Sequence, residues 1–196
     1  DAITALQFAA ETGRFFIGGA SRATNGGPIR RIDPGMSRPV GVGTGSVLGP
    51  VAPDGDTFVA FSYLNGTGGA AGHGVRDSIG KRIAADPSDP PLVELVTIEG
   101  IRSPLFDPRR ERTFSYDVAW APHGRAVTAL QRDSRSGRTR VVVRTVRDGR
   151  AAGPVLALTD GDVIGGQDAS IPPIPGRAIV WPTPERIVFF VPGSTA

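Results

Sequence analysis

The chain has 196 residues, of which 39% are apolar, so it is long enough for one sizeable domain with a buried core. Its 27 glycines and 18 prolines separate short apolar runs, which predicts many short strands joined by turns and not a disordered chain. A net charge of +3 is too small to indicate nucleic-acid binding by itself. The absence of cysteine excludes disulfides, thiol nucleophiles and cysteine-based metal sites.

The start of the chain carries a first strand-turn-strand pattern. Because the sequence begins with Asp1 and not Met, we expect a processed or truncated product, with a signal peptide or anchor on the precursor left open. Residues 6–20, "LQFAAETGRFFIGGA", then contain two apolar segments around Gly13. Residues 26–45 follow with a polar turn, a strand, a glycine turn and a second strand. This stretch predicts a four-stranded antiparallel unit.

The hairpin phrase recurs further along the chain. Residues 51–61, "VAPDGDTFVAF", and residues 120–130, "WAPHGRAVTAL", both place Ala-Pro, a polar residue and Gly before an alternating strand. Aligning the glycines of the three copies predicts one turn type, in which each glycine supplies a positive φ. The turn residues are Pro53, Asp54 and Gly55 in one copy, Pro122, His123 and Gly124 in the next, and Gly13 in the first. A fourth, weaker copy lies at residues 172–181 around Gly176.

The rest of the chain predicts how the hairpins are extended. Residues 136–161 continue the third hairpin with two more strands, so a unit has four strands over about 45–50 residues, the period of a propeller blade. We expect one domain over residues 1–196, with units at 1–50, 51–114, 115–161 and 162–196. The irregular spacing predicts a long loop-like insertion over residues 62–115, with one short helix at 77–86.

These phrases resemble the TolB-type, WD40-like β-propeller repeat, often called PD40, whose core is an apolar residue, Ser or Ala, then Pro-Asp-Gly and a strand. Pro53-Asp54-Gly55 matches fully, while Pro122-His123-Gly124 departs at its middle position. The resemblance implies an all-β fold of antiparallel, blade-like units, arranged as a small or incomplete propeller. It also implies a periplasmic or otherwise extracytoplasmic location. A piece cut from a longer propeller is an open alternative.

Candidate catalytic, metal and cofactor sites are weak in this sequence. His73 lies in a glycine-rich loop and His123 in a blade turn, and two histidines without cysteine do not make a metal-ligand pattern. There is no Gly-x-Ser-x-Gly elbow, and residues 41–46, "GVGTGS", lack the lysine of a phosphate loop. Asp160, Asp162 and Asp168 lack the order of an EF-hand. We therefore expect no catalytic residue, cofactor or metal.

Arginine clusters are the strongest candidates for binding. Of the 22 basic residues only Lys81 is a lysine, and many arginines fall in two short stretches. The residues expected to contact a partner are Arg109, Arg110, Arg112, Arg138, Arg140, Arg144 and Arg147. Arg140 and Arg144 share a strand face with Val142 and Val146, a mixture that is typical of an outer blade strand. Such residues suit an acidic protein surface or anionic lipid heads, and Trp120 and Trp181 suit packing between blades.

The function expected from these features is a non-catalytic protein-interaction module. It would be an extracytoplasmic accessory subunit that docks onto a larger, membrane-embedded bacterial assembly and does not bind nucleic acid. The alternative is a propeller fragment of a hydrolase or of a sugar-binding protein. An appended catalytic domain in the gene would favour that alternative.

Overall fold

The computed structural model describes residues 2–20, 27–62, 92–159 and 179–189. Within them, thirteen strands and one single-turn helix are present, and every strand pair is antiparallel, so the predicted all-β fold is confirmed. The predicted helix over 77–86, His73, Gly176 and the three aspartates at 160, 162 and 168 lie outside the described residues.

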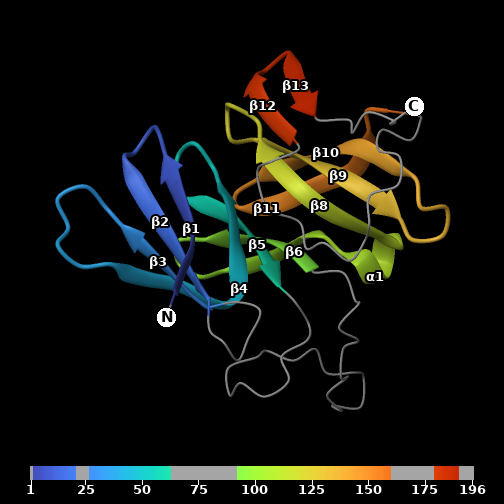
Figure 1. Cartoon of the computed structure of the whole chain (residues 1–196). Coiled ribbons are helices and arrows are strands. Elements are labelled where there is room, and N and C mark those ends of the chain that lie inside the picture. Colours follow the sequence, from blue (N-terminus) through green and yellow to red (C-terminus); the bar gives the residue numbers. More distant parts are fainter. Residues whose placement is uncertain (1, 21–26, 63–91, 160–178, 190–196) are drawn as a thin grey trace, which may run out of the picture.

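The first two four-stranded units share one long strand (Figure 1). The strands are β1 (Ala2–Ala9), β2 (Arg14–Ala20), β3 (Gly27–Ile32), β4 (Val40–Val51), β5 (Thr57–Ser62), β6 (Leu92–Thr97) and β7 (Arg102–Phe106). The first half of β4 pairs with β3, and its second half, from Val47, pairs with β5. Blade 1 is therefore β1 to β4, and blade 2 runs from the second half of β4 to β7.

Blade 3 and the start of a fourth unit follow. The elements are α1 (Pro108–Glu111), β8 (Thr113–Trp120), β9 (Ala126–Asp133), β10 (Thr139–Arg147), β11 (Arg150–Ala157), β12 (Ile179–Thr183) and β13 (Arg186–Phe189). Blade 3 is the four-stranded sheet β8 to β11, and β12 and β13 form a hairpin that we call blade 4. The expected unit boundaries after residues 50 and 114 fall inside β4 and β8 respectively. β10 pairs with strands on both sides, so it is not the outer strand that its arginines suggested.

The predicted loop-like insertion over residues 62–115 is wrong for its second half. Residues 92–97 and 102–106 form β6 and β7, the third and fourth strands of blade 2. The central four residues of β6 are buried because this strand lies inside the sheet. The run "LVELVT" was hidden in the sequence by the Pro, Asp and Gly residues around it, which indicate turns.

The hairpin turns of blades 2 and 3 are built alike, and the turn of blade 1 differs from them by one position. Gly13, Gly55 and Gly124 all have positive φ, at 67°, 72° and 69°, as predicted. Ala9 is the last residue of β1, while Ala52 and Ala121 directly follow β4 and β8, and all three are buried. Each alanine lies opposite the residue five positions later, which is Arg14, Thr57 or Ala126. Gly55 is two residues before Thr57, so its equivalent is Thr12, two residues before Arg14, and not Gly13. The glycine alignment of the first copy is therefore wrong by one residue, because its turn places the left-handed residue last.

The core lies between the blades. Along β5, Phe58 and Ala60 pack against blade 1, while Val59 and Phe61 pack against blade 3. This follows from the two-residue period of a strand, which sends alternate side chains to opposite faces. We call the face toward the preceding blade the leading face and the opposite one the trailing face. A third, smaller core joins Leu130 and Val141 of blade 3 to Ile179 of blade 4.

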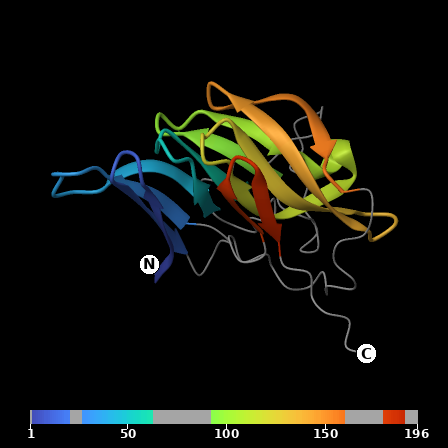
Figure 2. The same ribbon diagram turned by 90° about the horizontal axis from the view of Figure 1, so that it is seen from above.

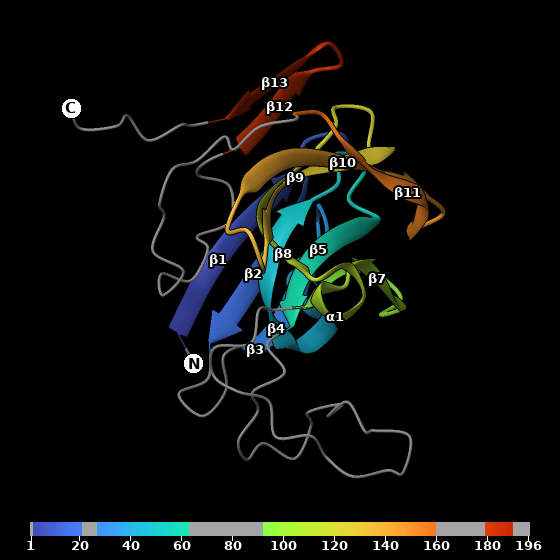
Figure 3. The ribbon, with the colours of Figure 1, turned by 90° about the vertical axis from the view of Figure 1, so that its right-hand side faces the viewer.

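The blades follow one another around an arc with their inner strands adjacent. Contacts join β1 to β4, β4 to β8, and β8 to β12, which are the first strands of successive blades. Figure 2 shows this succession from blue through green to orange, with the red hairpin beside the yellow inner strands. In Figure 3 β12 and β13 lie over β8 and β9, while β11 runs along the far edge of blade 3.

The hairpin turns of successive blades also touch one another. The Glu11 amide donates to the Pro53 carbonyl at 3.2 Å, which joins the turns of blades 1 and 2. Arg14 binds Asp33 at 3.1 Å and also reaches Asp56 of the next turn. At the far end, the rings of His123 and Trp181 meet edge to face with centroids 6.4 Å apart. The repeated turns thus lie together along one end of the molecule.

Candidate protein-binding surfaces

Arginines from two separate segments meet at one end of blade 3. The Arg112 carbonyl accepts hydrogen bonds from the Ser134 amide at 3.0 Å and from the Ser134 hydroxyl at 2.7 Å. These bonds hold the corner between α1 and β8 against the turn between β9 and β10. We call the resulting surface the arginine end; its exposed members are Arg110, Arg112, Arg135 and Arg138.

The acidic groups at the arginine end are already engaged. Asp133 Oδ1 accepts from the amides of Ser136 at 2.7 Å and Arg135 at 2.9 Å, and from the Ser136 hydroxyl at 3.0 Å. The backbone and side-chain bonds from Ser136 hold the pKa of Asp133 below its ordinary value. Asp107 approaches Arg110 at 3.5 Å, but the Arg110 side chain is 87% exposed, so this pair is weak. The surface therefore presents positive charge to solvent.

Two of the arginines expected to bind a partner are used inside the chain. Arg144 Nη1 lies 3.2 Å from Glu111 Oε1 and also donates to the Leu105 carbonyl. Gln131 Nε2 donates to the other Glu111 oxygen at 2.9 Å, and Arg140 donates to Gln131 Oε1 at 3.4 Å. Burial raises the pKa of Glu111, while Arg144 and Gln131 act in the opposite direction. This network ties β10 to α1 and β7.

Of the two remaining predicted arginines, Arg147 lies away from the arginine end, beside Arg150. Arg147 and Arg150 flank the turn between β10 and β11, at the opposite end of β10 from Arg138. A nine-residue strand rises about 3.3 Å per residue, so the two arginine groups are separated by most of the sheet's length. Arg109 belongs to α1. The structure therefore divides the sequence cluster between two ends of blade 3.

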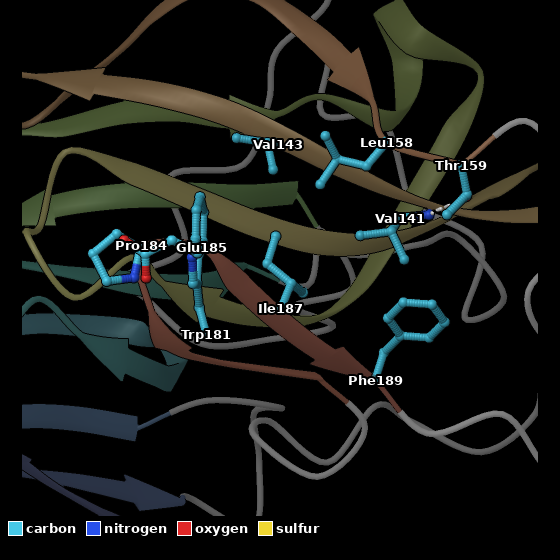
Figure 4. A pocket seen from close by; sticks show the side chains of 9 residues that line it. All are labelled: Val141, Val143, Leu158, Thr159, Trp181, Pro184, Glu185, Ile187 and Phe189. Carbon is cyan, nitrogen blue, oxygen red and sulfur yellow. Dashed lines mark hydrogen bonds between the residues drawn. The ribbon is translucent and has the colours of Figure 1, made fainter.

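A groove lies where blade 4 meets the outer part of blade 3. Its volume is about 450 Å³, and Figure 4 shows side chains from β10, β12 and β13 around it. The lining residues are Val141, Val143, Leu158, Thr159, Trp181, Pro184, Glu185, Ile187 and Phe189. The groove is mainly apolar and has one carboxylate, that of Glu185.

The tryptophans and turn residues serve the junctions between blades. Trp120 is buried in the core between blades 2 and 3, and its indole nitrogen donates to the Pro50 carbonyl at 3.0 Å. His123 Nδ1 accepts from the Arg125 amide at 3.1 Å, just as Asp54 Oδ1 accepts from the Asp56 amide at 3.0 Å. His123 therefore provides the same hydrogen-bond acceptor in its turn as Asp54 does in the turn of blade 2. Pro53 and Pro122 occupy the same position in their two turns.

Two polar features were not found by sequence reasoning. Arg102 Nη1 binds Glu94 Oε2 at 2.8 Å, Ser46 Oγ at 3.0 Å and Ser62 Oγ at 3.2 Å, and the Ser62 hydroxyl also donates to Glu94. Residues 41–46, examined as a phosphate loop, are part of β4, and Ser46 is buried in this cluster. The cluster joins β4, β5, β6 and β7, and it gives the ion pair of Arg102 and Glu94 two serine hydroxyls as further hydrogen-bond partners. No local pattern marks it, because its members are far apart in sequence.

Asp117 is the second missed residue. It interrupts the pairing of β8 with a bulge, has φ 53° and is buried. Its Oδ2 accepts from the Ile179 amide at 3.0 Å, which fastens blade 4 to blade 3. The signal in the sequence is an aspartate between Tyr116 and Val118, within a run that otherwise alternates as a strand.

Among the described residues, no group of three or more His, Asp or Glu side chains is placed to hold a metal ion. In the same part of the chain, no helix has the length and apolar character needed to cross a membrane.

No family model and no curated protein matches the sequence. The chain is similar to TolB from Acinetobacter baumannii, with 16% identity and a TM-score of 0.48 over 79% of this chain and 31% of that one. It is also similar to Kuenenia stuttgartiensis hydrazine synthase, with 11% identity and a TM-score of 0.43 over 78% and 36%. A prolyl endopeptidase matches at 17% identity and a TM-score of 0.34 over 79% and 28%.

The fold is an open β-propeller arc. This assignment rests on the successive four-stranded blades, their adjacent inner strands and the apolar cores between them. The chain spans about a third of the length of the solved structures that it matches. TolB, whose repeat the hairpin phrase resembles, is one of these structures.

Proposed function

We propose that the chain is a non-catalytic protein-interaction module that acts as an extracytoplasmic accessory subunit of a membrane-embedded assembly. The observation that carries the proposal is the arginine end, where exposed guanidinium groups from α1 and the β9–β10 turn converge while Asp133 is engaged by its own turn. Arginine suits carboxylate recognition because its planar fork can bind both oxygens. The partner surface is therefore acidic.

Charge reversal at matched positions tests the proposal. The test variant carries Arg110→Glu, Arg135→Glu and Arg138→Glu, and the control variant carries Arg125→Glu, Arg147→Glu and Arg150→Glu. All six residues are exposed, and both variants change the net charge equally, but only the first set lies at the arginine end. From detergent-solubilised native membranes, we expect the test variant to capture at least about tenfold less of the partner protein than the wild type does. The control variant should capture as much as the wild type.

The readout is quantitative mass spectrometry of the captured proteins at low and high salt. Because exposed charges are screened by salt, capture by the wild-type chain should fall as ionic strength rises. Equal capture by both variants would contradict the role of the arginine end. Binding of the wild type to anionic lipid vesicles, with no protein captured, would contradict a protein partner.

A further inference from the structure

Blade 1 exposes an apolar sheet face. On its leading face, Leu6 is 62% exposed, Phe8 53% and Phe15 43%, and the rings of Phe8 and Phe15 contact each other at an interplanar angle of 40° with centroids 4.8 Å apart. The register places Phe8 opposite Phe15 and Leu6 opposite Ile17, so these side chains form one continuous patch over β1 and β2. We call this patch the open face. Monomeric proteins rarely leave such contiguous apolar surface uncovered.

The positions of the open face are buried in the other blades. Phe15 is equivalent to Phe58 of blade 2 and Val127 of blade 3, because each directly follows the residue that closes its turn, which is Arg14, Thr57 or Ala126. Phe58 and Val127 are both 0% exposed, since the trailing face of the preceding blade covers them. The open face is thus a blade junction with one half missing.

The other half of such a junction is exposed at the far end of the arc. On β12 and β13, Ile179 packs toward blade 3, and its neighbour Val180 points to the opposite, trailing face. Val180 and Val188 lie directly opposite each other and are 46% and 47% exposed. Within the part of the chain that the structure describes, the leading face of blade 1 and the trailing face of blade 4 are therefore both exposed.

We propose that a second copy of this chain covers the open face, with its Val180 and Val188 packed on Leu6, Phe8 and Phe15. Each junction within the chain joins a trailing face to the leading face of the next blade, and this contact continues that series from one copy to another. Such a contact is head-to-tail, so it uses two different surfaces and leads to a closed ring or to a growing chain. It involves none of the residues of the arginine end.

Complementation between variants tests this geometry. Phe15→Asp places a charge on the open face, and Val188→Asp places one on the trailing face of blade 4. In sedimentation velocity at roughly 100 µM, we expect the wild type to self-associate and each variant alone to be monomeric. A 1:1 mixture should form a dimer and nothing larger, because one copy retains an intact open face and the other an intact trailing face.

Controls separate this result from loss of folding. Leu6→Asp and Val180→Asp should repeat the pattern on the same two faces, and circular dichroism should show the wild-type strand content. Ile101→Asp changes another residue, 52% exposed, in the β6–β7 turn and should self-associate as the wild type does. A monomeric wild type, self-association of a folded single-face variant, or a mixture that stays monomeric would each overturn the proposal.

Discussion

A single turn position explains why the hairpin phrase recurs. Gly55 and Gly124 adopt almost the same left-handed φ, and each amide donates to the alanine carbonyl three residues before it at 2.9 Å. The side chain before each glycine, Asp54 or His123, accepts from the amide two residues further on. The phrase is therefore conserved between these blades by backbone geometry, and the middle residue needs only an acceptor atom.

The same two glycines give a matched pair of substitutions. A Cβ at Gly55 would lie 2.8 Å from Thr12 Oγ1 and 2.9 Å from Ala9 Cβ, whereas one at Gly124 would lie 3.6 Å from Pro53 Cδ. Gly124→Ala should cost about 1–2 kcal/mol of unfolding free energy through its φ alone. Gly55→Ala should cost about 2–5 kcal/mol, because overpacking against blade 1 is added. Denaturant unfolding measures both, and equal costs would refute the tight junction at Gly55.

At the scale of elements, strands were predictable where a turn signal stood beside alternating apolar residues. The pairs β1–β2, β4–β5 and β8–β9 follow from the repeated phrase, and β10 and β11 follow from residues 136–161. β6 was missed because a short apolar run is ambiguous when turn-forming residues surround it. The arginines that are clustered in the sequence do not form one surface, because a strand places residues that are near in sequence at opposite ends of a sheet. Arg144 then found a half-buried partner in Glu111, which no local spacing indicates.

The contact of α1 with β10 makes blade 3 sensitive to pH. The pKa of Glu111 is raised in the folded chain, so the folded state holds the proton more tightly than the unfolded state does. The resulting stabilisation of the folded state is complete only below the ordinary glutamate pKa of about 4.3. The unfolding free energy of the wild type should fall relative to Glu111→Gln as the pH rises above the ordinary glutamate pKa.

Asp133 provides a comparison of opposite sign. Its lowered pKa gives stability above the ordinary aspartate pKa of about 3.9, so the wild type should gain relative to Asp133→Asn as pH rises through that value. Urea unfolding of the three proteins, at pH values below and above the ordinary pKa values of aspartate and glutamate, measures both effects. A difference between wild type and Glu111→Gln that does not change with pH would contradict the burial of this carboxylate.

At the scale of the whole molecule, the sequence predicted a four-stranded antiparallel unit. It did not predict at which residues each unit begins and ends. The faces of a blade become distinct only when other blades cover them, so Phe15 and Phe58 look alike in sequence and differ completely in exposure. Similarly, the hydrogen bonds from the Trp120 indole to Pro50 and from the Ile179 amide to Asp117 join residues more than 60 positions apart. Such junctions depend on tertiary packing, and no local pattern encodes them.

Nuclear Overhauser contacts across the blade junctions test the central account most directly. The arc predicts contacts between the rings of Phe16 and Phe58, whose centroids lie 5.7 Å apart, between the Trp120 indole and Pro50, and between Leu130 and Ile179. All three should appear in one spectrum of the folded chain. Contacts within each blade, without any of these three, would contradict the stacking of blades on which the fold and both proposals depend.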